Sequence, residues 1–362
     1  MEQLIKQYSD ESIKLLERMI GIPSVSRNET AVADMLEQQM KEWGLEPKRY
    51  KNNLVVDHQR QSTATDASPL TDGYILLNAH IDTVKPAESW TKDPFNPTYD
   101  GDKLYGLGSN DCGGGLVSLL AAYRVLTESN SPLTHGKRLI FVASAEEEVS
   151  GKDGFDYVRQ FLPDIEVAIV GEPTGMQPAI AETGLMVVDM VAHGKAGHAA
   201  RNEGINAIYE ALDDIQWIKE YQFEKTSDLL GPTKMSLTVI NAGSQHNVVP
   251  DRCEMVVDVR TNEHYSNEEV LEILKSHCKS DVKARSVRLS SSHIPKDHPL
   301  IQKLLSMGRQ PFGSPTLSDQ ALMPFPSFKM GPGDSARSHT ADEYIRKSEI
   351  EEAVRLYVEL LH

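Results

Sequence analysis

The chain has 362 residues, of which 40% are hydrophobic and 25% charged, and its formal net charge is -16. This length allows two domains and a large core. The acidic balance argues against nucleic acid as a partner, because nucleic-acid-binding surfaces are basic. No apolar run approaches the length of a membrane span. The three cysteines are too few for a disulfide framework, and the N-terminus lacks the pattern of a secretory signal. We therefore expect a cytoplasmic protein.

Predicted helices and strands alternate in the first half of the chain. Apolar residues at helical spacing predict helices over residues 8–20 and 30–43, with Asn28 as the N-cap of the second. The polar segment 59–72 is interpreted as a loop. Continuous apolar runs predict buried strands, and glycines open a third helix. These strands and this helix cover residues 53–56, 74–77, 138–143, 166–170 and, for the helix, 113–126. Such alternation is typical of an α/β domain with a largely parallel sheet.

The pattern changes after residue 180. The next predicted elements follow the order β-α-β-β-α-β, which is the ferredoxin-like arrangement. They cover residues 185–192, 206–218, 234–240, 253–259, 267–277 and 282–289. Afterwards a helix from residue 300, a strand near residues 327–330 and a helix from residue 348 resume the first pattern.

We therefore predict an α/β fold in which a mostly parallel mixed sheet is flanked by helices. Residues 1–180 and 292–362 form this domain, and residues 181–291 form an inserted ferredoxin-like α+β domain.

Residues that commonly bind metals follow several predicted strands. His80 and Asp82 come just after the strand at residues 74–77, and their spacing of two places both side chains on one side of an extended segment. A metal-bound histidine usually donates its other ring nitrogen to a carboxylate or carbonyl. We interpret His80 as a ligand and Asp82 as the group that orients it. Taken alone, His80 is better explained as an ordinary strand-end histidine.

Asp111 lies between a turn containing Gly106 and Gly108 and three glycines that open the next helix. A carboxylate bridges two cations only if the backbone approaches closely, and glycine permits that approach. The simpler alternative is a helix-capping aspartate. Three glycines in the first turn exceed what a cap requires.

Three adjacent carboxylates, Glu146, Glu147 and Glu148, follow the strand that ends at residue 143. They repel one another unless cations neutralise them. One of them can bind a metal while its neighbour accepts a proton from water. A solvated acidic turn is the usual explanation for such a run, but ligands collect at the carboxyl ends of buried parallel strands.

Glu172 follows the strand at residues 166–170 in the same way, and His339 follows the turn Gly331-Pro332-Gly333. Either residue alone is weak evidence. Together with the preceding residues they form the inventory for two divalent cations that share a bridging carboxylate. A two-metal site that activates water indicates hydrolysis.

An ordered set of motifs extends this interpretation over nearly the whole chain: H-x-D, G-x-x-x-D, E-E, G-E-P-T, G-x-x-G-H and G-P-G…H. With these motifs the chain resembles the di-zinc metallohydrolases that include acetylornithine deacetylase, succinyl-diaminopimelate desuccinylase, aminoacylase and glutamate carboxypeptidase. The resemblance implies two divalent metal ions, with Zn²⁺ favoured and Co²⁺ or Mn²⁺ as alternatives. It also implies that the inserted domain is a lid that forms a homodimer through the helix at residues 206–218.

The resemblance further implies five metal ligands, the first two on one zinc, the third bridging, and the last two on the other: His80, Glu172, Asp111, Glu148 and His339. Glu147 would be the general base, and Asp82 would support His80. This register matches residues 145–150 to the pattern D-E-E-x-S. A shift of one residue would exchange the base and a ligand. Cys112 would lie beside the metals as a small buried side chain.

In the inserted domain, the resemblance implies that His198 stabilises the oxyanion, reaching across from the partner subunit in dimeric relatives. Asn247 and Arg260 match residues that hold the substrate, and an arginine fork suits a carboxylate. The backbone at Gly331 and Gly333 would border the same pocket. Taken alone, the three side chains are equally well explained as a surface histidine, a turn asparagine and a strand-edge arginine.

The predicted function is hydrolysis of the N-acyl bond of a small-molecule N-acyl amino acid. Among the family members, the chain most resembles acetylornithine deacetylase, which acts in arginine biosynthesis, with an acetyl or a succinyl group as the acyl part. The alternatives are a succinyl-diaminopimelate desuccinylase, an aminoacylase or a dipeptidase. A non-catalytic metal-binding homologue is a remote alternative, because it would have lost a ligand or the base.

Overall fold

The computed structural model describes residues 1–57, 73–129, 137–201 and 203–362, so the predicted loop at residues 59–72 lies outside the described residues. The chain divides into two compact units. The first unit consists of Met1–Ile180, Ile294–Phe312 and Ser318–His362. The second consists of Ala181–His293 and the short segment Gly313–Leu317.

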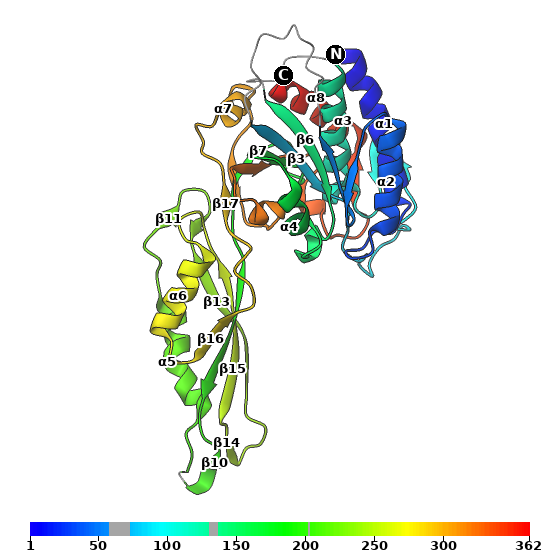
Figure 1. The fold of residues 1–362 in the computed structure, drawn as a ribbon. Helices are drawn as coiled ribbons and strands as arrows, with labels where there is room; N and C mark the ends of the chain where they lie inside the picture. The colour runs from blue at the N-terminus through cyan, green and yellow to red at the C-terminus, as the bar shows by residue number, and fades with distance from the viewer. Residues whose placement is uncertain (58–72, 130–136, 202) are drawn as a thin grey trace. The chain divides into compact units, whose positions relative to one another are not determined.

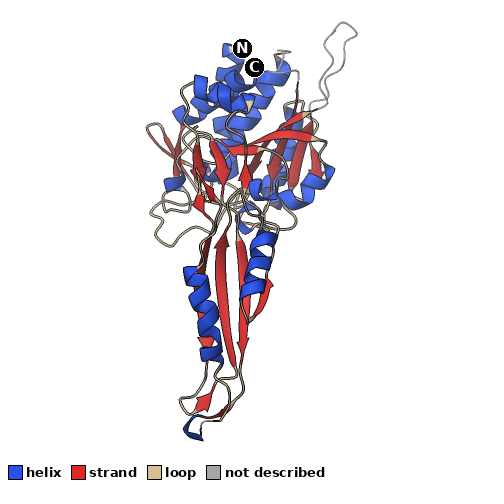
Figure 2. Cartoon of the chain, turned by 90° about the vertical axis from the view of Figure 1, so that its left-hand side faces the viewer, coloured by secondary structure: helices blue, strands red, loops and turns tan. Residues whose placement is uncertain are grey.

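The first unit is built on a mixed sheet with helices packed against it (Figures 1 and 2). The strand order is β1-β2-β6-β3-β7-β19-β8. The four central strands, from β6 to β19, are parallel, and β1, β2 and β8 are antiparallel to their neighbours. The strand bounds are Lys48–Tyr50 for β1, Asn53–Asp57 for β2, Tyr74–His80 for β3, Arg138–Ser144 for β6, Ile165–Val170 for β7, Ala179–Glu182 for β8 and Ser327–Lys329 for β19. The predicted mixed α/β fold is confirmed.

Three long helices of this unit, α1, α3 and α8, pack side by side (Figure 1). Their inward faces and the apolar strands form one continuous core. The helix bounds are Glu2–Ile20 for α1, Thr30–Glu42 for α2, Gly114–Glu128 for α3, Phe155–Val158 for α4, Pro299–Ser306 for α7 and Lys347–Leu361 for α8.

Two sequence predictions at helix starts are corrected. Helix α1 begins at Glu2, well before the predicted start at residue 8. Its first turn shows no apolar pattern in the sequence, because it is mostly polar and only Ile5 is buried there. Glu29, and not Asn28, directly precedes α2. The Glu29 side chain is buried and accepts the backbone N–H of Glu146 (3.3 Å), so it connects two loops of the first unit instead of capping the helix.

Strand β3 extends beyond its predicted end at residue 77. It pairs with β6 through the last residue of each strand, His80 opposite Ser144. His80 is therefore the final residue of a buried central strand, and does not follow the strand as predicted.

The second unit contains a four-stranded antiparallel sheet of order β13-β15-β9-β16 with two helices packed on it. Its main elements in chain order are β9 (Met186–His193), α5 (Ala207–Glu220), β13 (Lys234–Ala242), β15 (Arg252–Arg260), α6 (Asn267–His277) and β16 (Asp281–Ala284). Strand β16 ends before the predicted segment 282–289 does. Beyond it, the side chain of Asn267 donates to the carbonyl groups of Val287 and Leu289, and only an isolated bridge joins Leu289 to Leu185.

Short strands complete the described chain. They are β4 (Thr98–Asp100), β5 (Lys103–Tyr105), β10 (Gly197–His198), β11 (Thr226–Ser227), β12 (Gly231–Pro232), β14 (Val248–Val249), β17 (Ser292–His293), β18 (Phe312–Ser314) and β20 (Tyr344–Arg346). Within the described ranges, no helix combines the length and the apolar character that crossing a bilayer requires.

Candidate active site

The predicted ligands converge at one edge of the main sheet. His80 ends β3, the segment with Glu147 and Glu148 follows β6, Glu172 follows β7, and the turn that leads to His339 follows β19. Because β6, β3, β7 and β19 are parallel neighbours, their carboxyl ends lie at the same edge. Ligand sites in open α/β sheets form at this edge.

Asp111 lies between the two histidines of this cluster. Its Oδ1 is 3.2 Å from His80 Nε2, and its Oδ2 is 3.6 Å from His339 Nε2. On one side, Glu172 Oε1 lies 3.7 Å from His80 Nε2. On the other, Glu148 Oε2 lies 2.9 Å from His339 Nε2. The arrangement is two groups of metal-type donors that share one carboxylate.

Glycines before and inside α3 allow this close packing. Gly108 has φ +74° just before the segment Ser109–Gly113 that carries Asp111. A Cβ atom on Gly115 would lie 1.7 Å from the carbonyl oxygen of Gly171, the residue before Glu172. The helix start therefore packs directly on the backbone that presents Glu172.

Asp82 contacts His80 mainly through its backbone carbonyl group. Nδ1 of His80 lies 2.8 Å from the backbone oxygen of Asp82 and 3.7 Å from its carboxylate. The buried carboxylate instead accepts the backbone N–H groups of Glu147 (3.0 Å) and Glu148 (3.2 Å) and the hydroxyl of Ser26 (2.7 Å). Asp82 thus orients His80 through its carbonyl group and fixes the glutamate segment through its side chain.

The site holds more carboxylate groups than nearby positively charged side chains can neutralise. Burial, and then the charge of Asp111, raises the pKa of Glu172 to about 8. Burial also raises the pKa of Glu147 well above its ordinary value. Oε1 of Glu172 is buried, and no described residue gives it a hydrogen bond. Divalent cations neutralise such clusters, and imidazole with carboxylate donors suits Zn²⁺, Co²⁺ or Mn²⁺. The site fits two metal ions.

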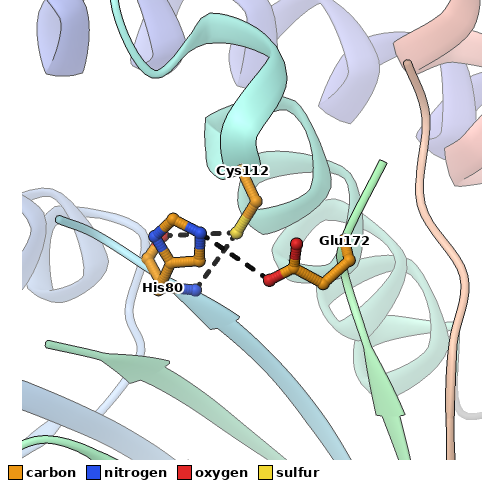
Figure 3. A group of neighbouring side chains, drawn as sticks. All are labelled: His80, Cys112 and Glu172. Atoms are coloured by element: carbon orange, nitrogen blue, oxygen red, sulfur yellow. Dashed lines mark hydrogen bonds and ion pairs between the residues drawn. The ribbon is translucent and has the colours of Figure 1, made fainter. Parts of the chain in front are cut away.

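Cys112 lies beside His80, with Sγ next to the backbone of that residue (Figure 3). Its Sγ accepts the backbone N–H of His80 at 3.2 Å and lies 3.6 Å from the carbonyl oxygen of the same residue. Sγ also belongs to a compact group of potential ligand atoms with His80 and Glu172. Burial raises the pKa of the thiol. The side chain is small, buried and hydrogen-bonded to the strand.

Two residues that the sequence analysis did not single out hold the Asp111 segment. The carboxylate of Glu343 accepts the backbone N–H groups of Gly108 (3.1 Å), Asn110 (2.7 Å) and Asp111 (2.9 Å). The side chain of Asn110 accepts the N–H of Asp334 (3.0 Å) and donates to its carbonyl oxygen (3.1 Å). Both residues tie the Asp111 segment to the segment that carries His339. Their only local signal is proximity to a predicted ligand.

Asp319 is a third residue that the sequence did not single out, and it lies at the end of β6. It is buried and accepts the hydroxyl of Ser144, the last residue of β6, at 2.6 Å. Burial raises the pKa of Asp319 to about 7. No local sequence feature distinguishes it.

The glycines predicted to border the pocket both lie against the site. A Cβ atom on Gly331 would be 2.5 Å from the carbonyl oxygen of Glu172. Gly333 has φ +88°, and a Cβ atom there would be 2.3 Å from Oδ1 of Asn110. Both positions therefore require glycine.

The three predicted residues of the second unit do not lie together. His198 is exposed in β10 and pairs with Val248 of β14, and the N–H of Ala199 bonds to the carbonyl oxygen of Asn247 (3.1 Å). His198 and Asn247 are thus neighbours beyond one end of β15, while Arg260 ends that strand (Figure 1). A nine-residue strand separates its ends by roughly 26 Å.

Comparisons with known proteins identify the family of this chain. Residues 76–362 match the model of peptidase family M20/M25/M40. The chain is 29% identical to an acetylornithine deacetylase of Proteus mirabilis, over 80% of this chain and 79% of that protein. It is 27% identical to a probable succinyl-diaminopimelate desuccinylase of Staphylococcus aureus, over 93% of each.

Among solved structures, the fold resembles the Bacillus subtilis YXEP protein, a dinuclear metal-binding peptidase of the M20 family, with a TM-score of 0.71 at 18% identity over 98% of both chains. The family model covers more than half of the chain, including every segment that supplies a predicted ligand. The chain therefore belongs to peptidase family M20/M25/M40 and is a hydrolase of that family.

Proposed function

We propose that the protein removes an N-acyl group from an amino acid, with an N-acyl-ornithine as its substrate in arginine biosynthesis. The observation that carries the reaction type is the position of Asp111, with one carboxylate oxygen facing each histidine. The named acetylornithine deacetylase among the relatives supports the substrate.

The donor groups divide into two sets that share Asp111. His80, Asp111 and Glu172 would hold one cation, and Asp111, Glu148 and His339 the other. We propose Zn²⁺, with Co²⁺ or Mn²⁺ as alternatives that the same donors accept. Two bound cations would activate a water molecule and polarise the acyl oxygen.

Glu147 is the proposed general base. Its Oε2 lies 4.0 Å from His80 Nε2, and its side chain is 11% exposed. Neither proposed donor set includes it. It accepts a proton from the attacking water and delivers that proton to the leaving amine. A positioned carboxylate commonly acts in this way as a general base and then a general acid. The backbone N–H groups of Glu147 and Glu148 donate to the Asp82 carboxylate and so hold this segment in place.

A homodimer through the second unit is the proposed assembly. Strand β13 is an edge strand, and large apolar side chains are exposed on it and on α5, which packs against it. These side chains are Tyr209, Leu212, Val239 and Ile240. Exposed edges and grouped apolar side chains favour association.

His198 and Asn247 lie roughly 26 Å from Arg260 along β15. The two ends cannot hold one small substrate within a single second unit. We therefore propose that Arg260 of one protomer acts with His198 and Asn247 of the other. His198 would stabilise the oxyanion, and Arg260 and Asn247 would hold the substrate carboxylate, with the second unit as the lid.

All three cysteines are free. This suits a reducing compartment and supports the proposed cytoplasmic location.

Steady-state hydrolysis by the metal-reconstituted protein tests the function. The substrates are N-acetyl-ornithine, N-succinyl-ornithine and N-succinyl-diaminopimelate, with N-acetyl-methionine as a general control. A preference of at least tenfold in kcat/KM for either ornithine derivative supports the proposal. Preference for N-succinyl-diaminopimelate would favour the second candidate, a desuccinylase, which the match over 93% of each chain to the Staphylococcus aureus protein supports. No hydrolysis of any substrate by protein with two bound metals would contradict both.

A further inference from the structure

A pocket of about 310 Å³ lies entirely within the second unit. Its walls include the turn between β11 and β12, the first residue of β13 and the last of β15. The segment Gly313–Leu317 closes one side, and Gly313 packs so tightly there that a Cβ atom would lie 2.5 Å from the carbonyl oxygen of Leu229. The volume suits an amino-acid-sized group.

Two positively charged side chains, those of Lys234 and Arg260, line this pocket. Lys234 of β13 pairs directly with Arg260 of β15 in the antiparallel register. Residues paired in this way project on the same face with Cβ atoms about 4.5–5.5 Å apart, and like charges in this relationship are destabilising. Both line the pocket, and none of its described lining residues carries a carboxylate.

The two cations differ in how their charge is balanced. Nε and Nη2 of Arg260 donate to Asp258 at 2.9 and 3.2 Å, which leaves Nη1 directed elsewhere. Lys234 is exposed and forms no ion pair with any described residue. The uncompensated positive charge of the pocket therefore resides on Lys234.

Other polar groups of the pocket are already engaged. The side chain of Asn262 donates to the carbonyl oxygen of Gly231 (2.9 Å), and the hydroxyl of Thr261 donates to Asn267 (3.0 Å). Leu229 and Leu230 supply an apolar wall. The groups left for a ligand are thus two cationic donors beside an aliphatic surface.

We infer that Lys234 is a further specificity-determining residue beside Arg260, and that it makes this pocket selective for a negative charge carried on an aliphatic part of the substrate. The inference rests on the proposed function for its view that the ligand is the substrate. It adds to Arg260 a second cation whose charge no neighbour neutralises.

The test compares Lys234→Met with Lys283→Met, which removes an exposed lysine from β16 of the same sheet outside the pocket. The metal-loaded enzymes are assayed with the best N-acyl amino acid and with its carboxamide analogue. Loss of a charge-assisted hydrogen bond raises KM for the carboxylate substrate about tenfold or more. We expect kcat to change less than twofold, KM for the carboxamide to stay constant, and Lys283→Met to match the wild type.

Asp258→Asn provides the opposite change. It removes the charge that balances Arg260, so we expect tighter binding of the carboxylate substrate and a steeper salt dependence. An equal rise in KM for the carboxylate and the carboxamide in Lys234→Met, or no rise, would overturn the inference.

Direct binding of glutarate, measured by calorimetry on the metal-loaded wild type and on Lys234→Met, separates this inference from the proposed function. Weaker binding of glutarate by Lys234→Met supports the subsite even if no N-acyl amino acid is hydrolysed. Equal glutarate binding by both proteins contradicts the subsite even if the enzyme hydrolyses N-acyl-ornithine.

Discussion

The carboxylate of Asp82 accepts the backbone N–H of Glu147 at an Oδ1–N distance of 3.0 Å. A residue that follows β3 thereby determines where the segment after β6 lies. The ring of His80 contacts the carbonyl oxygen of the same aspartate. Asp82 therefore couples a proposed ligand, His80, to the proposed base, Glu147.

We expect Asp82→Asn to lower kcat by about 10- to 100-fold, the range found when support of a metal site is lost. The new amide group must face at least one of the N–H groups of Glu147 and Glu148, which repels that segment. Kinetics of the metal-saturated variant measure the effect. Ser26→Ala removes only the hydroxyl partner of Asp82 and serves as the control with a smaller expected loss. Equal losses in both variants would contradict a special role for the backbone bonds.

Glu147→Gln should lose about 10²- to 10⁴-fold in kcat while it retains both cations, because neither donor set requires Glu147. Metal content measured alongside kcat also checks the register of the glutamate run. If the base were Glu148 and the ligand Glu147, then Glu147→Gln would bind one cation fewer.

The proposed shared active site makes a prediction about mixtures. Inactive His198→Ala and inactive Glu147→Gln should regain activity when their protomers are exchanged, because a mixed dimer contains one site with an intact base and an intact partner histidine. Recovery approaches a quarter of the wild-type rate at full exchange if each active site is independent. No recovery in mixtures shown to contain mixed dimers counts against action in trans.

Gly115→Ala should destabilise the protein by about 3 kcal/mol or more, because the added methyl group would overlap the carbonyl oxygen of Gly171 and force α3 off the strand end. Gly21→Ala is the matched control. A Cβ atom there meets nothing closer than 3.5 Å, and φ is -67°, so this change should be neutral or slightly stabilising. Denaturant unfolding of the two variants measures the difference.

Asp319 predicts a pH dependence of the metal-free protein. Burial raises its pKa from 3.8 to about 7, so between about pH 4 and pH 7 the folded state holds a proton that the unfolded chain has released. Stability contributed by this proton is present at the acidic end and is lost as the pH rises through the window. Asp319→Asn stays neutral throughout. Its unfolding free energy should fall less between pH 4.5 and pH 7 than that of the wild type, and identical slopes would contradict the assignment.

The site residues that could be predicted are those whose neighbouring sequence shows both a metal-binding side chain and its place at the end of a strand or turn. His80, Asp111 and Glu172 each stand where an apolar run or a glycine turn ends, so their chemistry and their place in the sheet are visible together. The structure brings these residues into one cluster, as expected from strands that share a direction.

Glu343 and Asp319 were not predictable, because they act on groups that no local pattern reveals. Glu343 accepts backbone N–H groups of residues more than two hundred positions earlier. The contacts of the Asp82 carboxylate were not predictable for the same reason, because the backbone N–H groups that donate to it belong to Glu147 and Glu148, far along the chain. The sequence predicts too early an end for β3 because Asn78 and His80 are polar, although both belong to the buried strand.

Strand β19 lies beside β7 in the sheet, although the entire second unit separates the two in the chain. During synthesis, the N-terminal strands and the second unit emerge before the segment that carries His339 exists. The second unit can form its local strand pairs meanwhile, but the parallel pairing of β7 with β19 has to wait for the last part of the chain. In a nascent chain the proposed donor set therefore stays incomplete until His339 is made, so the proposed site can hold both cations only after the last strand of the sheet has formed.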